Sequence, residues 1–193
     1  MKRICVFCGS NSGANLQYLQ AAEEVGVFLA QNGIELVYGG GRVGLMGKVA
    51  DTVLANGGKV IGVIPEQLAT REVAHSGLTE LIVVSSMHER KAMMAELSDG
   101  FIAMPGGFGT FEEFCEIVTW AQLGIHQKPC ALLNVAGFYD SLIAMIDYST
   151  SQNFIRQEHR SLVLVDKTIE MLHRKMKNFQ PPDLEKWLDK SST

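Results

Sequence analysis

The stretch GFIAMPGGFGTFEEF, residues 100–114, combines an apolar run, a glycine-rich turn and the start of a helix. The apolar run ends at Pro105, three glycines follow, and apolar residues then recur at helical spacing after Thr110. A strand, a glycine turn and a helix in this order favour an α/β sheet whose turn approaches a phosphate. Two acids, Glu112 and Glu113, follow where an anion is expected to bind, so their role needs an explanation.

The same alternation of apolar runs and helical segments continues along the chain. Most of the runs are nearly continuous, as expected for parallel strands that are buried on both faces. The pattern predicts an open, parallel α/β sheet of about seven strands, flanked by helices and joined by right-handed crossovers. The expected strands are residues 3–8, 34–38, 59–64, 81–84, 101–104, 130–135 and 162–165.

Length and composition limit the possible classes of protein. The 193 residues are 47% hydrophobic, which suits one domain over residues 1–180 followed by a polar tail over 181–193. The net charge of −4 comes without a basic run, so we expect no nucleic-acid partner. No apolar run approaches the roughly 18 residues of a membrane span. We therefore expect no membrane contact and a cytoplasmic location.

The spacing Cys5-x-x-Cys8 is also found in redox and zinc sites. Here it falls inside an expected strand, where residues three apart point to opposite faces, and no second pair completes a zinc site. We interpret both cysteines as small buried hydrophobic residues, and we expect no metal site.

Three glycine-bearing turns follow expected strands at residues 8–13, 39–47 and 105–110. Ligands of open parallel sheets bind at the carboxyl ends of the strands, where these turns meet. Each glycine alone could simply make a tight turn, but three such turns on one edge favour a site that the backbone approaches closely. Ser10, Gly40 and Gly41 are binding candidates from the first two turns.

Gly39, Gly41 and Gly44 match the spacing of a dinucleotide fingerprint, with Glu66 as the distant acid. An NAD(P)-dependent oxidoreductase is therefore an alternative. Against it, the motif follows the second expected strand and leaves residues 105–110 unexplained. A P-loop is excluded because Lys48 is followed by Val49 rather than by Ser or Thr.

Arg90 and Lys91 stand near the start of another expected helix, for which Ser86 and Glu89 form a capping box. The helix dipole disfavours exposed cations there by about 0.3–1 kcal/mol each. Arg90 also shares a stripe with apolar residues, so it is expected to be half-buried and to need a partner. That partner is either an acid, such as Glu113 or Glu72, or a ligand phosphate.

Glu113 has two interpretations. With Thr110 as N-cap, Glu113 would complete a capping box and serve the helix alone. The expected core stripe of this helix is Phe111, Phe114, Cys115 and Val118. Glu113 would then point away from the core together with Ile117 and Trp120, and we expect a second subunit to cover that face.

Several stretches resemble the Lonely Guy (LOG) family of cytokinin riboside 5′-monophosphate phosphoribohydrolases, which are often mislabelled lysine decarboxylases. PGGFGTFEE at 105–113 is similar to the family signature PGGxGTxxE, and the resemblance covers roughly residues 4–165. The other matching stretches are VYGGG at 37–41, GLMG at 44–47, VIGVIP at 60–65, MHERK at 87–91 and TWAQLGIHQKP at 119–129.

The resemblance implies a Rossmann-like fold, a homodimer, no cofactor, and hydrolysis of the N-glycosidic bond of adenosine-type nucleoside 5′-monophosphates. It implies catalytic roles for Arg90 and Glu113. A non-catalytic nucleotide-binding or carrier module of the same fold remains an alternative. His88 is a general-acid candidate by residue type alone. The substrate contacts that the resemblance implies are Glu72, Lys91, Gly107, Phe108, Gly109, Thr110, Glu112 and Thr119.

Overall fold

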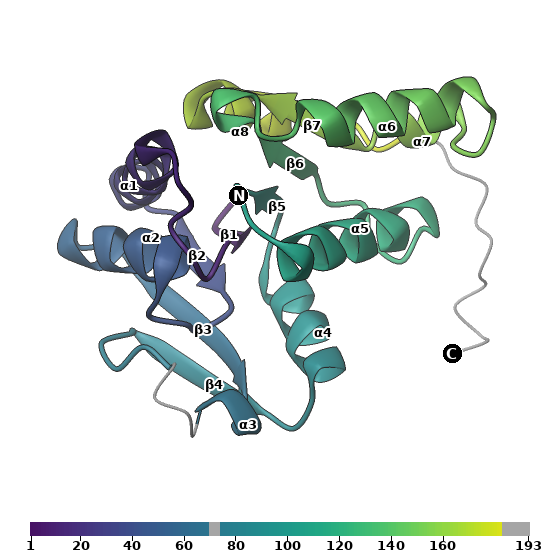
Figure 1. Ribbon diagram of the computed structural model, residues 1–193. Helices are drawn as coiled ribbons and strands as arrows, with labels where there is room; N and C mark the ends of the chain where they lie inside the picture. Colours follow the sequence, from purple (N-terminus) through teal and green to yellow (C-terminus); the bar gives the residue numbers. More distant parts are fainter. Residues whose placement is uncertain (70–73, 183–193) are drawn as a thin grey trace.

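Seven parallel strands form a single sheet in the order β4-β3-β2-β1-β5-β6-β7. The computed structural model describes residues 1–69 and 74–182 (Figure 1). The strands confirm the expected sheet, with ends that differ by one or two residues from the expected ones. They are β1 (Arg3–Phe7), β2 (Glu35–Tyr38), β3 (Val60–Pro65), β4 (Glu80–Val84), β5 (Phe101–Ala103), β6 (Cys130–Leu133) and β7 (Val163–Asp166).

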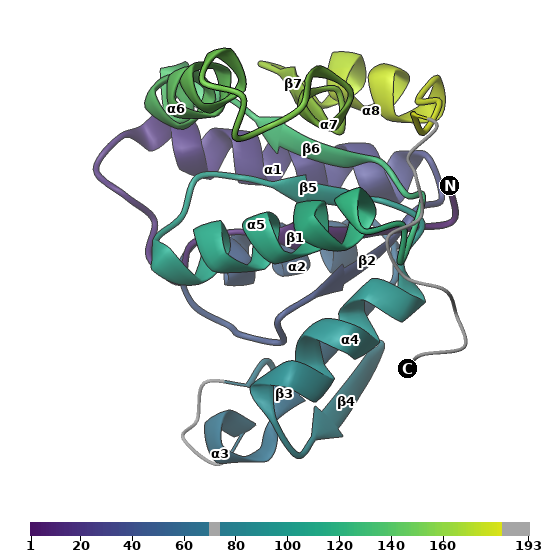
Figure 2. The ribbon, with the colours of Figure 1, turned by 90° about the vertical axis from the view of Figure 1, so that its right-hand side faces the viewer.

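Helices cover both faces of this sheet, and Figure 2 shows α4 and α5 in front of it with α1 and α2 behind. Side chains of α1, α2 and α8 pack on one face, and those of α4, α5 and α6 pack on the other. The helices are α1 (Leu16–Gln31), α2 (Gly44–Ala55), α3 (Glu66–Ala69), α4 (Met87–Leu97), α5 (Phe108–Gln122), η1 (Val135–Gly137), α6 (Asp140–Ser151), α7 (Gln157–Arg160) and α8 (Ile169–Lys177).

Alternate residues of β1 enter opposite cores, as the period of a strand requires. Cys5 packs among the residues under α4 and α5, whereas Cys8, just past the end of β1, packs among those under α1 and α2. Both are free and buried. The interpretation of these cysteines as buried small residues is therefore confirmed.

The order of the strands places a topological switch point between β1 and β5. The chain runs outward from β1 through β2 and β3 to β4, then returns to place β5 on the other side of β1. The turns that follow β1 and β5 therefore diverge to opposite faces and leave a crevice at the carboxyl edge of the sheet.

The start of α5 differs from the sequence expectation. Gly107, not Thr110, is the N-cap, and the first helical bond runs from the N–H of Phe111 to the carbonyl of Gly107 at 3.1 Å. Thr110 folds back instead: its Oγ1 would stand 2.1 Å from a Cβ at Gly106. Because the helix starts three residues earlier, Glu113 lies beyond the first turn, and the capping-box interpretation of Glu113 is wrong.

The buried face of α5 also differs from the expected stripe. Thr110, Phe114, Ile117 and Ala121 are its buried residues, whereas Cys115 is exposed. Ile117 packs in the core beneath α4 and α5 of the same chain. The face that carries Glu113 is thus covered by this chain's own core, and the argument that a second subunit must cover it is wrong.

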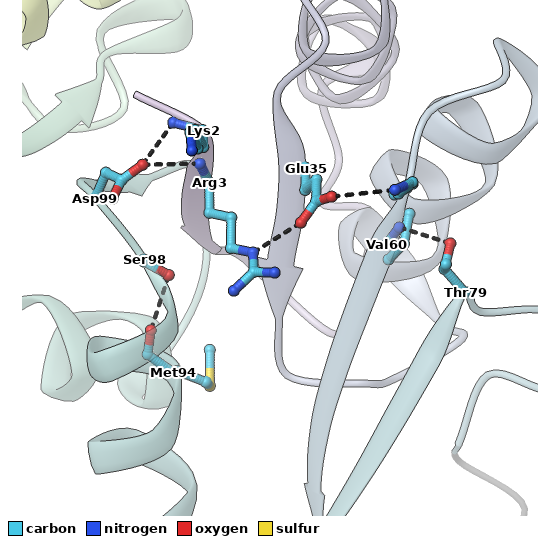
Figure 3. Close-up of polar contacts among 9 residues, drawn as sticks. Lys2, Arg3, Glu35, Val60, Thr79, Met94, Ser98 and Asp99 are labelled. Atoms are coloured by element: carbon cyan, nitrogen blue, oxygen red, sulfur yellow. Dashed lines mark hydrogen bonds and ion pairs between the residues drawn. The ribbon is translucent and has the colours of Figure 1, made fainter.

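Polar bonds fasten the strands at the opposite, amino-terminal edge of the sheet (Figure 3). Asp99 accepts bonds from the backbone N–H groups of Lys2 and Arg3, at 2.5 and 3.0 Å. Arg3 Nε donates to Glu35 Oε2 at 2.7 Å, which links β1 to β2. The N–H of Val60 donates to Thr79 Oγ1 at 3.0 Å. Most of the expected polar tail, residues 183–193, lies outside the described residues.

Candidate active site

A cleft of about 270 Å³ opens at the switch point, between the turn after β1 and the start of α5. It contains seven of the residues expected from the sequence: Ser10, Arg90, Gly107, Phe108, Gly109, Thr110 and Glu113. Cys8, Gly9 and Met46 complete the lining, and none of them was named as a binding residue from the sequence, although Cys8 and Gly9 belong to the turn at residues 8–13. The expected convergence of the glycine turns at one edge would have pointed to Gly9, which directly precedes Ser10.

The amino terminus of α5 forms one wall of the cleft. Its N-cap, Gly107, supplies no side-chain acceptor. The N–H groups of the first turn of a helix have no partner within the helix, and together with the helix dipole they attract anions. A Cβ at Gly107 or at Gly109 would meet no atom within 4 Å, so the space in front of these residues is open. This wall suits a phosphate group.

Arg90 and Glu113 form the charged end of the cleft. α4 begins after its N-cap Ser86, which accepts a bond from the N–H of Glu89 at 3.1 Å and so brings Arg90 near the start of the helix. Arg90 Nη2 lies 3.4 Å from Glu113 Oε1, and each side chain is only 11% exposed. The pair therefore joins α4 to α5 at the carboxyl edge of the sheet.

The guanidinium of Arg90 has few acceptors in the part of the chain that the structure describes. Its Nε is buried without a hydrogen-bond partner, and Nη1 donates only weakly, to Met87 Sδ at 3.8 Å. Because a buried arginine normally has its donors satisfied, this one is suited to bind an additional anionic ligand.

The environment of Glu113 favours its protonated form. Burial raises the pKa of Glu113, and the nearby charge of Arg90 lowers it by less, so that the net shift is upward. Arg90 alone would keep Glu113 ionised, and burial outweighs that effect here. A buried carboxyl group with a raised pKa, placed beside an arginine in a cleft, is typical of a catalytic acid or base.

Three of the expected substrate contacts, Lys91, Glu112 and Thr119, do not line this cleft. Lys91 Nζ pairs with Glu112 Oε1 at 2.5 Å and with Glu116 Oε2 at 2.9 Å, and these two acids raise the pKa of Lys91 although burial lowers it. Thr119 is exposed on α5 and donates to the carbonyl of Cys115 at 2.7 Å. His88 is also exposed and does not line the cleft. Glu72 lies outside the described residues.

Gly40 and Gly41 are buried and do not line the cleft. The carbonyl of Gly40 accepts a bond from the N–H of His75 at 2.9 Å, and Gly41 pairs with Ala74. A Cβ at Gly44 would stand 2.3 Å from the backbone of Ser10. The glycines of the presumed dinucleotide fingerprint thus pack against the chain itself, which disfavours that alternative.

A second cavity of about 300 Å³ adjoins the first and shares Gly9, Ser10 and Gly107 with it. Tyr18 and Phe138 form its aromatic side, with ring centres 5.7 Å apart and an edge-to-face geometry. The crevice therefore has a charged end at Arg90 and Glu113, a glycine-lined middle and an aromatic end.

The fold and the site together define a Rossmann-like nucleotide-binding protein with an arginine–carboxylate pair at its switch point. Residues 46–176 match a family model described as "Possible lysine decarboxylase". The chain is 51% identical over 177 residues to the probable cytokinin riboside 5′-monophosphate phosphoribohydrolase LOGL1 of Oryza sativa subsp. japonica, covering 92% of this chain and 79% of that protein.

A second relative has a similar sequence identity. The cytokinin riboside 5′-monophosphate phosphoribohydrolase of Rhodococcoides fascians is 52% identical over 170 residues, covering 88% of this chain and 86% of that protein. The chain belongs to the LOG family of cytokinin riboside 5′-monophosphate phosphoribohydrolases. The resemblance noted in the sequence is confirmed.

Solved structures support the fold at lower sequence identity. The molybdenum cofactor binding protein of Rippkaea orientalis matches with a TM-score of 0.69 and 22% identity, covering 92% of this chain and 97% of that one. The molybdenum cofactor carrier protein of Chlamydomonas reinhardtii matches with a TM-score of 0.66 and 22% identity, covering 91% and 96%. At this identity the likeness concerns the fold alone.

Proposed function

We propose that this protein hydrolyses the N-glycosidic bond of adenosine-type nucleoside 5′-monophosphates, including AMP and N6-prenylated cytokinin riboside monophosphates. The products are the free base and ribose 5-phosphate. The observation that carries the proposal is the buried pair of Arg90 and Glu113 in a cleft whose opposite wall is a helix amino terminus. The relatives described above carry this activity in their names.

The substrate phosphate binds at the start of α5 in this proposal. The backbone N–H groups of residues 107–110 and the hydroxyl of Ser10 surround it, and the dipole of α5 favours its charge. Arg90, whose Nε has no partner among the described residues, attracts the same anion and orients the ribose toward Glu113. These contacts place the reacting carbon beside the carboxylate.

Glu113 then acts on the ribosyl carbon. Cleavage of the bond between C1′ and the base nitrogen moves its electron pair to the base and leaves positive charge on the sugar, as in an oxocarbenium ion. The Glu113 carboxylate stabilises that charge and accepts a proton from the water that adds to C1′. Transfer of that proton to the base nitrogen completes the free base and returns Glu113 to its ionised form. The upward pKa shift of Glu113 makes the group a stronger base than an exposed glutamate.

Lys91, Glu112 and Thr119 contact the substrate only if the site extends beyond the cleft of one chain. We therefore also propose a homodimer. Exposed apolar side chains on α6 and the segment after it support it: Met145 is 61% exposed, Tyr148 62% and Phe154 87%. Tyr148→Glu should shift the mass measured by light scattering from two chains to one, and an unchanged mass would contradict an interface there.

We propose that the protein is cytoplasmic. We also propose that residues 1–180 form one catalytic domain. The four cysteines are all free, as is usual for proteins of reducing compartments. Within residues 1–69 and 74–182, no helix is both long and apolar enough to cross a membrane.

Incubation of the purified protein with AMP tests the activity. We expect adenine and ribose 5-phosphate in equal amounts by chromatography, and isopentenyladenine from the prenylated monophosphate. The matching riboside without the phosphate should react far more slowly because it lacks the group that α5 binds. A protein that binds AMP without releasing base over a long incubation would instead be a carrier.

A further inference from the structure

The guanidinium of Arg90 lies directly against the backbone of Gly39, the first residue after β2. A Cβ at residue 39 would stand 1.9 Å from Arg90 Nη2 and 3.0 Å from Arg90 Cζ. Gly39 is not among the glycines with a positive φ, so its backbone conformation is open to other residues. The three atoms nearest to such a Cβ all belong to the guanidinium of Arg90.

The neighbouring glycines have different reasons to be glycine. Gly40 and Gly44 have φ angles of 74° and 61°, which disfavour any side chain. A Cβ at Gly44 would also collide with the backbone of Ser10 and Asn11. Gly39 differs because the three atoms nearest to a methyl group there all lie at the tip of a side chain.

We propose that Gly39 is a positioning residue for the reaction: the space left by its missing side chain is the seat that holds Arg90 beside Glu113. This inference rests on the function proposed above. It adds a residue that acts through Arg90 and needs no contact with the substrate.

The backbone turn at Gly39 cannot easily move away from an added methyl group. Behind Gly39, the carbonyl of Gly40 is bonded to the N–H of His75, and Gly41 is paired with Ala74. His75 is fixed in turn, because its Nε2 lies 2.9 Å from Asp51 Oδ1 on α2 and its Nδ1 accepts a bond from the N–H of Gly77 at 3.0 Å. The turn is thus anchored, whereas Arg90 ends in a flexible chain. Arg90 is the group that must yield.

Little else holds the guanidinium in place. Its pairing with Glu113 spans 3.4 Å, its contact with Met87 Sδ spans 3.8 Å, and its Nε has no partner among the described residues. The position of the guanidinium therefore depends on the space that the missing side chain of Gly39 leaves. A displacement of about 1 Å at a catalytic group can lower a rate about 100-fold.

The test is a double-mutant cycle of Gly39→Ala and Arg90→Ala, with kcat for adenine release from AMP as the first measurement. We expect Gly39→Ala to lower kcat about 100-fold in the wild-type background. In the Arg90→Ala background the new methyl group meets no guanidinium, so the second substitution should change kcat less than twofold. Equal fold-changes in both backgrounds would overturn the proposal, because Gly39 would then act independently of Arg90.

Two further measurements keep the cycle informative if Arg90→Ala is too slow to assay or if AMP is not hydrolysed at all. The Kd of AMP, measured by calorimetry on the four proteins, should rise with Gly39→Ala only when Arg90 is present. The urea midpoint of unfolding should fall with Gly39→Ala in the wild-type background, because Glu113 loses its partner, and should not fall in the Arg90→Ala background. Wild-type protein that releases no adenine would refute the proposed function. Additive effects on both the Kd and the urea midpoint would refute the role of Gly39 in positioning Arg90.

Discussion

At the amino-terminal edge of the sheet, the Asp99 carboxylate accepts bonds from the backbone N–H groups of Lys2 and Arg3, and the Arg3 side chain donates to Glu35. At the carboxyl edge, Arg90 and Glu113 are more deeply buried, yet their charged atoms approach only to 3.4 Å and Arg90 Nε has no partner within the described residues. The same strands carry both edges, so the difference comes from the residues placed at their ends.

The pKa shifts at the two edges have opposite directions. Bonding with Arg3 lowers the pKa of Glu35, and the bonds from the N–H groups of residues 2 and 3 lower that of Asp99 although burial raises it. Burial raises the pKa of Glu113. A carboxylate that is well paired stabilises the fold, whereas one that is buried with a weak partner costs stability and gains reactivity. The amino edge is thus suited to hold the sheet together, and the carboxyl edge to bind and react.

Glu113→Gln should produce the largest effect, a loss of about 1000-fold in kcat for base release, because glutamine can neither accept a proton nor carry a charge. The fold should remain, since removing a buried charge and leaving Arg90 unpaired change stability in opposite directions. Steady-state kinetics measure kcat, and circular dichroism shows whether the variant is folded. Glu116→Gln, on the same helix but outside the cleft, is the matched control, and activity retained by Glu113→Gln would remove this residue from the mechanism.

Arg90→Lys should lower kcat/KM by about 100-fold while keeping the positive charge, because an ammonium group cannot reproduce the planar, bidentate contact. The unfolding midpoint should change little. If Arg90 acted only as a nearby charge, the lysine variant would retain most of the wild-type activity, and kcat/KM for AMP would decide between the two roles.

As the pH is lowered, kcat/KM, which depends on the carboxyl edge, should fall before the fold, which the amino edge stabilises, is lost. Because burial favours protonated Glu113, its ionised form is lost at a higher pH than that of an exposed glutamate, near 4.3. As the pH falls below the pKa of Glu113, kcat/KM should decrease about tenfold per unit. Circular dichroism at each pH should still report a folded protein where the rate has begun to fall. Loss of rate and fold at the same pH would contradict a separate titration of Glu113.

Asp99→Ala should affect stability and leave catalysis unchanged. The substitution removes the acceptor for two backbone N–H groups, which we expect to cost about 1–2 kcal/mol of unfolding free energy. Urea denaturation measures the loss, and kcat for AMP should stay within twofold of wild type. Asp99→Asn keeps one acceptor oxygen and should lose less. A large fall in kcat would show that the two edges are not independent.

The sequence was sufficient for the sheet because its signals are local. Near-continuous apolar runs such as residues 60–64 indicate strands buried on both faces, and every expected strand is present. A partner for Arg90 could be expected in advance because a half-buried arginine needs one, but the sequence left Glu113, Glu72 and a ligand phosphate open. The residue at which α5 begins could not be predicted, because it depends on the Thr110 side chain folding back against Gly106. The role of Gly39 in positioning Arg90 was also missed, because only the folded structure brings the end of β2 next to Arg90.

Glu35→Gln should have the smallest effect and shows how the amino edge depends on pH. Glu35 joins Arg3 at 2.7 Å and Lys59 at 3.5 Å, all partly exposed, so we expect a loss of about 0.5 kcal/mol at neutral pH. The pKa of Glu35 is lowered in the folded protein, so its contribution is present above the unfolded value near 4.3 and disappears as the pH falls through the folded value. Urea midpoints of the wild type and the variant should therefore converge in acid. A difference that persists there would mean that Glu35 stabilises the sheet by packing rather than by charge.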